Sequence, residues 1–335
     1  MSGMDYRSLG STGLQVSRIA LGCGNFGGIG SAPEFFGQGE SDAEAAAIMD
    51  AAFDLGINVF DTADAYGGGR SETAIGKWLA SKGSAVRDQV LLSTKAFNPV
   101  GDGPNDRGLS RRHLVRQVDA SLARLGAERL DLFLIHEPDP LTPLEETLSA
   151  LDDLRRAGKL LYIGASNIEA WRLARALWIS DVRGLSRFEW VQSSYSLLDR
   201  SAEAEVLPLC AELGLGFSPF SPLTGGWLTG KYRRDEDAPE GSRMTLRSGP
   251  YEHLQRAEVF DALERLEQMA SQRGVDMASL ALAWLLASPL VNPIVVGPRR
   301  PEHLAPAITA LDLSLSDADI FEISELFPRS LGAAA

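Results

Sequence analysis

Cysteine is scarce in this sequence. Its 335 residues include only Cys23 and Cys210, which lie far apart and form neither a CxxC motif nor a Cys/His ligand spacing. Disulfide-rich domains and zinc modules need several such residues at short intervals, so neither class of structure is indicated. His113, His253 and His303 show no metal-ligand spacing either, and we expect no metal site.

Long apolar runs are also missing. The most apolar stretch, Leu280 to Ala287, is far shorter than the roughly 18 residues that cross a bilayer. The opening residues, MSGMDYRSLGSTG, lack the apolar segment of a secretory signal. We therefore expect a cytoplasmic protein that does not interact with membranes.

Positive charge is not in excess. Lys and Arg number 32 against 45 Asp and Glu, which gives a formal net charge of −13. Nucleic-acid binding depends mainly on Lys and Arg that neutralise phosphates, so a nucleic-acid partner is not expected and a small-molecule partner is favoured. The 44% of apolar and 23% of charged residues are typical of an ordinary globular protein.

Helix start and stop signals alternate with short apolar runs along most of the chain. Ser41 with Glu44 predicts a capping box, Ser110 predicts a second helix start, and Thr142 before Pro143 predicts a third. The runs between the helices are rich in β-branched residues, as buried parallel strands are. They are RIAL, INVF, VLLST, LFLI, LYIG, EWVQ, GFSPF and PIVVG. Eight alternating units predict an α/β fold of the closed (β/α)8 TIM-barrel type.

The whole chain, residues 1–335, is interpreted as one domain, with the barrel at roughly 17–311 and a C-terminal extension over 312–335. The segment DYRSLGSTGLQVSRI has a Gly-rich turn between two extended pieces. It predicts an N-terminal β-hairpin that covers the floor of the barrel. Two connections, 24–40 and 223–250, are too long for ordinary βα loops, and we expect functional loops at the C-terminal face.

Polar side chains end several of the predicted strands. Asp61, Lys95, His136, Asn167 and Gln192 each follow an apolar run. In a barrel the C-terminal ends of the strands meet at one mouth, where TIM-barrel active sites lie. One polar strand end would most simply be a solvated loop residue, but five of such different chemistry predict a functional site.

Tyr66 lies shortly after Asp61 and indicates which chemistry such a site could perform. A tyrosine has an ordinary pKa of about 10, and a neighbouring Lys95 ammonium would lower that pKa by stabilising phenolate. Asp61 would keep Lys95 charged, and a neutral His136 would hydrogen-bond a carbonyl oxygen. We interpret the four residues as a general-acid site for reducing C=O. Lys95 as the imine former of an isomerase or aldolase, or as a cation at the barrel rim, stays open as an alternative.

Several longer motifs follow one another in a family-specific order: GINVFDTADAYGGGRSE, LLSTKAF, LFLIHEPD, GASN, Gln192 with the YSLL after it, and FSPLTGGWLTGKY. In these motifs the chain resembles the aldo-keto reductase superfamily, from about Tyr6 to Ala310. The resemblance implies a (β/α)8 barrel that binds NADPH in extended form without a Rossmann domain. It also implies an NADP-dependent oxidoreductase that reduces an aldehyde, ketone or keto-sugar. The family's catalytic tetrad maps onto Asp61, Tyr66, Lys95 and His136, with Tyr66 as the acid/base.

The resemblance also assigns cofactor residues at the nicotinamide end. Ser166, Asn167 and Gln192 match side chains that hold the carboxamide. Phe220 falls where an aromatic ring stacks on the nicotinamide, a role that needs only the ring face. GCGNFG at residues 22–27 matches GxGxxG, but no helix starts there, so we do not interpret it as a dinucleotide fingerprint.

The phosphate end is expected in the loops after the last two strands. The pyrophosphate residues there would be Ser221, Leu223, Gly225 and Lys231. The residues for the adenosine 2′-phosphate would be Gly297, Arg299, Arg300 and His303. An arginine fork suits a phosphate dianion, which favours NADPH over NADH. Relatives usually carry Glu and Asn where this chain has Pro306 and Ala307, and Gln or Arg where it has His303.

Aromatic residues are expected to line the substrate pocket: Phe26, Phe35, Phe36, Phe97 and Trp227. The function predicted from the sequence is NADPH-dependent reduction of a small carbonyl compound. A rival interpretation is a regulatory or binding protein similar to potassium-channel β-subunits, in which bound nucleotide serves sensing.

Overall fold

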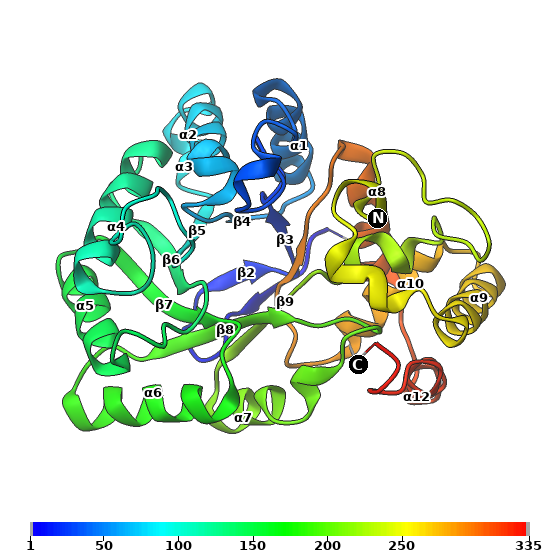
Figure 1. Ribbon diagram of the computed structural model, residues 1–335. Helices are drawn as coiled ribbons and strands as arrows, with labels where there is room; N and C mark the ends of the chain where they lie inside the picture. Colours follow the sequence, from blue (N-terminus) through cyan, green and yellow to red (C-terminus); the bar gives the residue numbers. More distant parts are fainter. Residues whose placement is uncertain (1–2, 333–335) are drawn as a thin grey trace.

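Eight parallel strands form a closed barrel, as the sequence predicts (Figure 1). The structure, a computed structural model, describes residues 3–332. Listed as hydrogen-bonded neighbours, the strands are β10 (Ile294–Val296), β3 (Ile19–Gly22), β4 (Val59–Asp61), β5 (Leu91–Ala96), β6 (Leu130–Ile135), β7 (Leu160–Ser166), β8 (Phe188–Ser194) and β9 (Gly216–Phe220). A parallel bridge between Phe217 and Val291, just before β10, joins the two ends of this order. All eight predicted apolar runs are confirmed as barrel strands.

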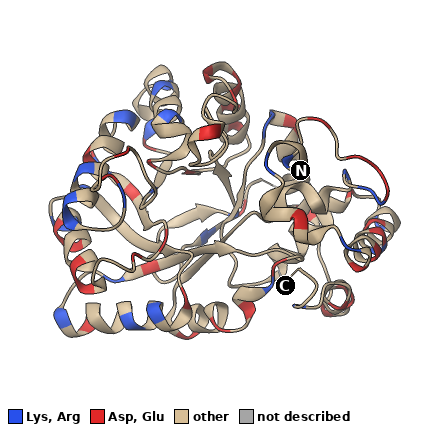
Figure 2. Ribbon diagram, viewed as in Figure 1, with Lys and Arg blue, Asp and Glu red and all other residues tan. Residues whose placement is uncertain are grey.

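Helices surround the strands and alternate with them along the chain (Figure 1). Figure 2 shows that the charged residues lie mainly on these outer helices, with both signs interspersed. Between consecutive strands lie α1 (Asp42–Asp54), α2 (Arg70–Lys82), α3 (Ser84–Arg87), α4 (Arg111–Leu125), α5 (Leu144–Arg156), α6 (Ala170–Arg183), α7 (Val206–Leu213), α8 (Arg243–Leu246), α9 (Ala257–Gln272) and α10 (Met277–Ala287). After β10 come α11 (Ala305–Asp312) and α12 (Asp317–Leu326). The loops also contain the short 3-10 helices η1 (Pro33–Phe35), η2 (Tyr66–Gly69), η3 (Ser201–Glu203), η4 (Thr224–Thr229), η5 (Gly249–Leu254) and η6 (Pro301–Leu304).

Two helices begin at the caps that the sequence predicts. At α1, Ser41 Oγ accepts a hydrogen bond from the Glu44 N–H, and the Glu44 carboxylate accepts one from the Ser41 N–H. At α4, Ser110 Oγ accepts from the His113 N–H. These bonds satisfy backbone N–H groups that have no partner within the helix, which fixes where each helix begins.

The predicted start of α5 is wrong by one residue. Pro143, not Thr142, occupies the N-cap position, and the helix begins at Leu144 without a side-chain cap. The Thr142 hydroxyl donates instead to Asp139 Oδ2 at 2.8 Å. That bond satisfies the hydroxyl within the preceding loop, so it is not free to cap the helix.

An antiparallel hairpin of β1 (Tyr6–Ser8) and β2 (Gln15–Ser17) precedes the barrel. Leu9 and Val16, in this hairpin, are fully buried. They pack in one cluster with Ala20, Val59, Leu132, Leu134, Trp190 and Val295 from the barrel strands. The hairpin thus covers the floor of the barrel, as predicted, and leaves the C-terminal ends of the strands as the open face.

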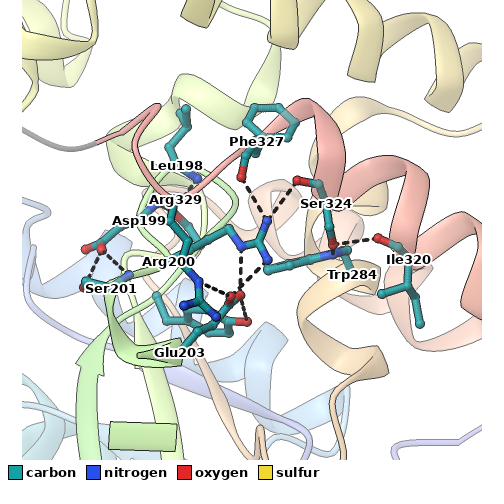
Figure 3. A network of polar contacts seen from close by, with 12 residues as sticks. Leu198, Asp199, Arg200, Ser201, Glu203, Trp284, Ile320, Ser324, Phe327 and Arg329 are labelled. Atoms are coloured by element: carbon teal, nitrogen blue, oxygen red, sulfur yellow. Dashed lines mark hydrogen bonds and ion pairs between the residues drawn. The ribbon is translucent and has the colours of Figure 1, made fainter. Parts of the chain in front are cut away.

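The C-terminal extension is attached to the loop after β8 (Figure 3). Arg200 Nη1 donates to the backbone carbonyls of Ser324 and Phe327, both at 2.9 Å. The remaining nitrogens of this guanidinium reach both oxygens of Glu203, which also pairs with Arg329. A bidentate arginine of this kind is strongly oriented, so it holds α12 against the barrel.

The most apolar helix, α10, is buried from Met277 to Leu286 but is only 11 residues long. Within residues 3–332 the structure contains no helix with both the length and the apolarity of a membrane span.

Candidate active site

The C-terminal ends of the strands surround a cavity of about 680 Å³. Its wall includes residues at or directly after β4, β6, β7, β8 and β9: Asp61, His136, Ser166, Asn167, Gln192 and Phe220. Tyr66, from η2 after β4, also lines it. A cavity of this size lies within the usual range of ligand and cofactor sites, about 300–1,000 Å³. The structure therefore brings the predicted strand-end residues into one site.

Lys95 and Asp61 form a buried ion pair at this site. Lys95 Nζ lies 2.6 Å from Asp61 Oδ2, and the two side chains are only 1% and 5% exposed. Lys95 also donates to the Thr62 carbonyl at 2.9 Å, while Ser93 and Gln192 donate to Asp61 Oδ1. Each charge is thus hydrogen-bonded as well as paired, as a buried ion pair requires.

The ion pair fixes the charge state of Lys95. Burial has the largest single effect and lowers the pKa of Lys95, but the Asp61 carboxylate, with Tyr66 and Cys23, raises it, so that the net pKa lies above its ordinary value. Lys95 is therefore an ammonium whose lone pair is not available. This state argues against the imine-forming alternative.

Tyr66 lies between this ammonium and His136. Lys95 Nζ is 5.3 Å from the centroid of the Tyr66 ring, and the Tyr66 and His136 rings meet edge to face with centroids 5.6 Å apart. Burial raises the pKa of the Tyr66 phenol, the Lys95 charge opposes this, and the Asp61 charge adds to it. The net shift is upward, so the expected lowering of the Tyr66 pKa is wrong. The physical reason is that desolvation of a fully buried phenolate outweighs one ammonium that is already paired with a carboxylate. Tyr66 is consequently a protonated acid at neutral pH.

His136 is neutral and its proton can be placed. Burial, with the Lys95 charge as a second cause, lowers the pKa of His136 to about 3. Its Nδ1 lies 3.2 Å from the Asn98 side-chain nitrogen, which also donates to Ser31 Oγ. An amide nitrogen can only donate, so Nδ1 accepts and the proton of the neutral ring is on Nε2. Asn98 was missed by the sequence analysis, because it is one unremarked loop residue after β5.

The expected carboxamide residues lie together on the cavity wall. Asn167, with a positive φ of 52°, donates from Nδ2 to the His136 carbonyl at 3.1 Å. Its neighbour Ser166 accepts a second bond from the same nitrogen at 3.2 Å. Gln192 uses its Nε2 on Asp61, which leaves its Oε1 to face a ligand. Phe220 completes this wall at the end of β9.

Most of the expected phosphate-end residues also line the cavity: Ser221, Leu223, Gly225, Lys231, Gly297, Arg299 and His303. Arg300 does not line it and contacts the His303 ring, 3.4 Å from Nη2 to Nε2. Arg299 pairs with Glu40 at 2.8 Å and donates to the Gly241 carbonyl. One arginine of the expected fork is therefore outside the cavity, and the other is partly neutralised.

Two cavity arginines, Arg243 and Arg247, were missed by the sequence analysis. They belong to α8 and its C-cap in the long loop after β9. Arg243 donates to Asn25 Oδ1 at 2.5 Å. The only signal for them was the arginine content of the predicted functional loop, because no local pattern shows which of its side chains point inward.

The aromatic residues expected around the substrate lie elsewhere. Phe26 and Trp227 are buried in the main hydrophobic core, where Trp227 packs on Tyr232 and Phe260. Phe35, Phe36 and Phe97 are likewise not among the residues that line the cavity. The physical reason for Phe26 and Trp227 is that burying a large ring in the core removes more apolar surface from water than lining an open cavity does. Apolar residues that do line the cavity include Ile29, Leu223, Tyr251 and Leu282.

Glycines allow the first long loop to pass close to Tyr66. A Cβ at Gly28 would lie 2.8 Å from Gly67 Cα, closer than carbon atoms pack. β3 ends at Gly22 and the next α-helix begins only at Asp42. The GxGxxG match over 22–27 therefore opens no helix, and these residues form a close-packed loop at the mouth.

Comparison with known proteins places the chain in one family. A model of the Aldo/keto reductase family matches residues 18–327. The chain is 38% identical to "Uncharacterized oxidoreductase YrpG" of Bacillus subtilis, over 97% of this chain and 96% of that protein. It is 36% identical to "L-glyceraldehyde 3-phosphate reductase" of Escherichia coli O157:H7 (96% and 92% covered). It is also 36% identical to a "Probable voltage-gated potassium channel subunit beta" of Oryza sativa subsp. japonica (92% of each chain). The chain belongs to the aldo/keto reductase family of oxidoreductases.

Proposed function

We propose that this protein is a cytoplasmic, NADPH-dependent reductase that converts an aldehyde, ketone or keto-sugar carbonyl to an alcohol. The observation that carries the proposal is the meeting of Tyr66, His136 and the buried Asp61–Lys95 pair at a cavity that also holds amide-binding and cationic side chains. Family membership and the reductases among its relatives support the reaction class.

Tyr66 donates the proton in this proposal. As the carbonyl oxygen gains negative charge, the phenol protonates it, and the Lys95 ammonium stabilises the phenolate that remains. Asp61 keeps Lys95 charged and aimed at this position. His136 donates from Nε2–H to the same oxygen, which orients the carbonyl toward Tyr66.

The residues at the nicotinamide end fit that cofactor chemically. Ser166, Asn167 and the free oxygen of Gln192 offer the donors and acceptors that a carboxamide needs. Phe220 offers a ring face for stacking. A reduced nicotinamide held there supplies a hydride to the carbonyl carbon.

The residues at the other end fit phosphates. The surrounding protein and the charges of Arg243 and Arg299 lower the pKa of Lys231. Such mutual repulsion among cations is relieved when an anion binds between them. We assign the pyrophosphate to the loop of Ser221 to Lys231, and the 2′-phosphate to Arg299 with Arg243. Pro306 and Ala307 line the cavity nearby and offer only apolar contacts to an adenine.

The cofactor assignment is tested by fluorescence titration with NADPH and NADH. We expect tighter binding of NADPH, and Arg299→Ala should reduce that preference because it removes a charge from the 2′-phosphate. Tighter binding of NADH by the unaltered protein would contradict the assignment.

A nucleotide-sensing role is the second candidate, because a relative that aligns along 92% of this chain is named as a potassium channel β-subunit. Stopped-flow measurement of NADPH oxidation, with a panel of aldehydes, ketones and keto-sugars, separates the two candidates. A reductase shows fast oxidation with at least one carbonyl. If no carbonyl accelerates oxidation of the bound nucleotide, the sensing role is favoured.

A further inference from the structure

Arg247 is a cation on the cavity wall without a carboxylate partner among residues 3–332. The two other cavity arginines have polar partners: Arg243 bonds Asn25 and Arg299 pairs with Glu40. Arg247 only lies over the ring of Phe35, with its guanidinium carbon 5.8 Å from the centroid. An arginine on a cavity wall that has no carboxylate partner is available to an anion.

Arg247 lies over a loop segment that is hydrogen-bonded to the turn of the proton donor. Its Nη1 is 3.3 Å from the position that a Cβ would take at Gly30. The Gly30 carbonyl accepts a hydrogen bond of 3.0 Å from the N–H of Gly67, the residue after Tyr66. The guanidinium is therefore close to the turn that carries the phenol.

The same loop segment also contacts the support of His136. Ser31, next to Gly30, accepts a bond from Asn98, and Asn98 contacts His136 Nδ1, both at 3.2 Å. Residues 30–31 are thus linked to the neighbours of both groups that would touch the carbonyl oxygen. Arg247 therefore contacts the loop segment that is linked to the neighbours of Tyr66 and His136.

The phosphate-binding cations contact a different part of this loop. Arg243 reaches Asn25 and Arg299 reaches Glu40, and the Glu40 N–H donates to the Asn25 carbonyl at 2.9 Å. Those two arginines therefore meet at the base of the loop. Arg247 contacts its middle, at Gly30 and Phe35.

From its unpaired charge and its contacts at Gly30 and Phe35 we propose that Arg247 binds an anionic group on the substrate, so that the substrate class is aldehydes or ketones that carry a carboxylate or a phosphate. The inference rests on the proposed function. Arg247 makes charge-assisted hydrogen bonds to the anion and places the carbonyl at Tyr66 and His136. It does not take part in proton transfer.

Matched substrate pairs test the proposal. The anionic compounds are succinic semialdehyde and glyceraldehyde 3-phosphate, and their neutral counterparts are methyl 4-oxobutanoate and glyceraldehyde. The variants are Arg247→Met, which keeps the length but removes the charge, and Arg247→Lys, which keeps the charge. Arg112→Gln, an exposed residue of α4, removes an equal charge outside the cavity and serves as the control.

We expect kcat/KM to be at least about tenfold higher for one anionic compound than for its neutral counterpart, and the preferred pair identifies carboxylate or phosphate. Arg247→Met should lower kcat/KM for that compound by about 10- to 100-fold through KM, the scale of a charge-assisted hydrogen bond. Neutral compounds and the Kd for NADPH should change less than about twofold, and Arg247→Lys should retain part of the preference.

Three results would overturn the inference: equal rates for anionic and neutral compounds, an equal loss for both in Arg247→Met, or a main effect on the Kd for NADPH. If no carbonyl is reduced, the proposed function fails, and calorimetric titration of 4-hydroxybutanoate and of glycerol 3-phosphate into the NADPH-loaded protein then decides about Arg247. Binding of one of these two compounds that is lost in Arg247→Met supports the anion site. If neither compound binds, or if binding is unchanged in Arg247→Met, the anion site is refuted.

Discussion

Gln192 and Asp61 are joined by a hydrogen bond of 3.1 Å from Gln192 Nε2 to Asp61 Oδ1. Gln192 ends on the wall assigned to the nicotinamide carboxamide, and Asp61 holds Lys95 beside Tyr66. The bond therefore couples the wall that we propose for carboxamide binding to the buried ion pair. A change at one of these groups should be felt at the other.

Substituting Gln192 by Leu tests this coupling. The variant removes an acceptor for the carboxamide and a donor to Asp61, so we expect the Kd for NADPH to rise about tenfold. The turnover number should fall as well, but less than for Tyr66→Phe. Fluorescence titration and steady-state kinetics measure both effects. Unchanged nucleotide affinity would contradict the assignment of Gln192.

Substituting Tyr66 by Phe removes the transferable proton and little volume. We expect a loss of at least about a hundredfold in turnover with nearly unchanged NADPH affinity, the scale of a general acid. Tyr195→Phe is the matched control, because that buried hydroxyl donates to Glu203 away from the cavity. The control should lose about 1 kcal/mol of stability and keep its turnover. Near-normal turnover in Tyr66→Phe would assign the proton to another group.

Substituting Asn98 by Asp should reverse the tautomer of His136. A carboxylate accepts from Nδ1–H, which moves the proton away from Nε2 and raises the pKa of His136 above about 3. We expect at least about a tenfold loss of turnover, because the donor to the carbonyl oxygen is removed. Asn98→Leu, which leaves the tautomer unfixed, should lose less. Nitrogen NMR of the imidazole reports the tautomer directly, and an Nε2–H signal retained in Asn98→Asp would refute the role of Asn98.

Substituting Asp61 by Asn should change how stability depends on pH. In the unaltered protein the pKa of Lys95 is higher in the folded state than in the unfolded chain. The stabilisation that charged Lys95 provides is therefore complete when the pH is below the pKa of the unfolded chain, and it is lost as the pH rises through the pKa of the folded protein. Without Asp61, burial dominates and lowers that pKa. We expect the free energy of unfolding of Asp61→Asn to be lower by about 3–5 kcal/mol at pH 7. Part of this loss should be recovered as the pH rises toward the pKa that Lys95 has in the unfolded chain.

Urea denaturation at pH 7 and at higher pH measures this effect. Asp42→Asn is the control, because the Asp42–Lys77 pair is exposed, with both side chains 63% accessible. Such a pair contributes less than about 1 kcal/mol. A loss in Asp61→Asn as small as that of the control would show that the buried pair is not required for folding.

Substituting His136 by Gln should reduce acid sensitivity. The pKa of His136 is about 3 in the folded protein, below the ordinary 6.5. Between these two pH values the histidine is protonated in the unfolded chain but not in the folded protein. The stabilisation that neutral His136 provides is therefore complete when the pH is above the pKa of His136 in the unfolded chain, and it is lost as the pH falls toward 3. The difference in unfolding free energy between the two proteins should shift in favour of the variant between pH 7 and pH 4, by roughly 1–3 kcal/mol. An unchanged difference over this range would contradict a neutral, buried His136.

The sequence predicted the parts of the site that follow from strand periodicity. Asp61, Lys95, His136 and Gln192 end or follow buried strands, and parallel strands bring such ends together whatever the loops do. The hairpin and the cap at Ser41 were local patterns of the same kind. The cap predicted for α5 at Thr142 could not be read from a local pattern, because the Thr142 hydroxyl donates a hydrogen bond to Asp139 in the preceding loop.

What the sequence did not predict depends on the paths of long loops and on burial. Arg243, Arg247 and Asn98 reach the site from connections whose course no local pattern determines. The direction of the Tyr66 pKa depended on how completely the phenol is desolvated. Trp227 was placed beside the substrate from its chemistry, whereas the fold buries it against Tyr232.

Leu9 and Val16 close the floor of the barrel, so anything that enters the cavity must also leave through the same mouth. A dinucleotide lying along the depth of this cavity would sit beneath the smaller reactant. Turnover should therefore follow a compulsory order, in which the dinucleotide binds before the carbonyl compound. The alcohol should then be released before the oxidised dinucleotide is exchanged for a reduced one.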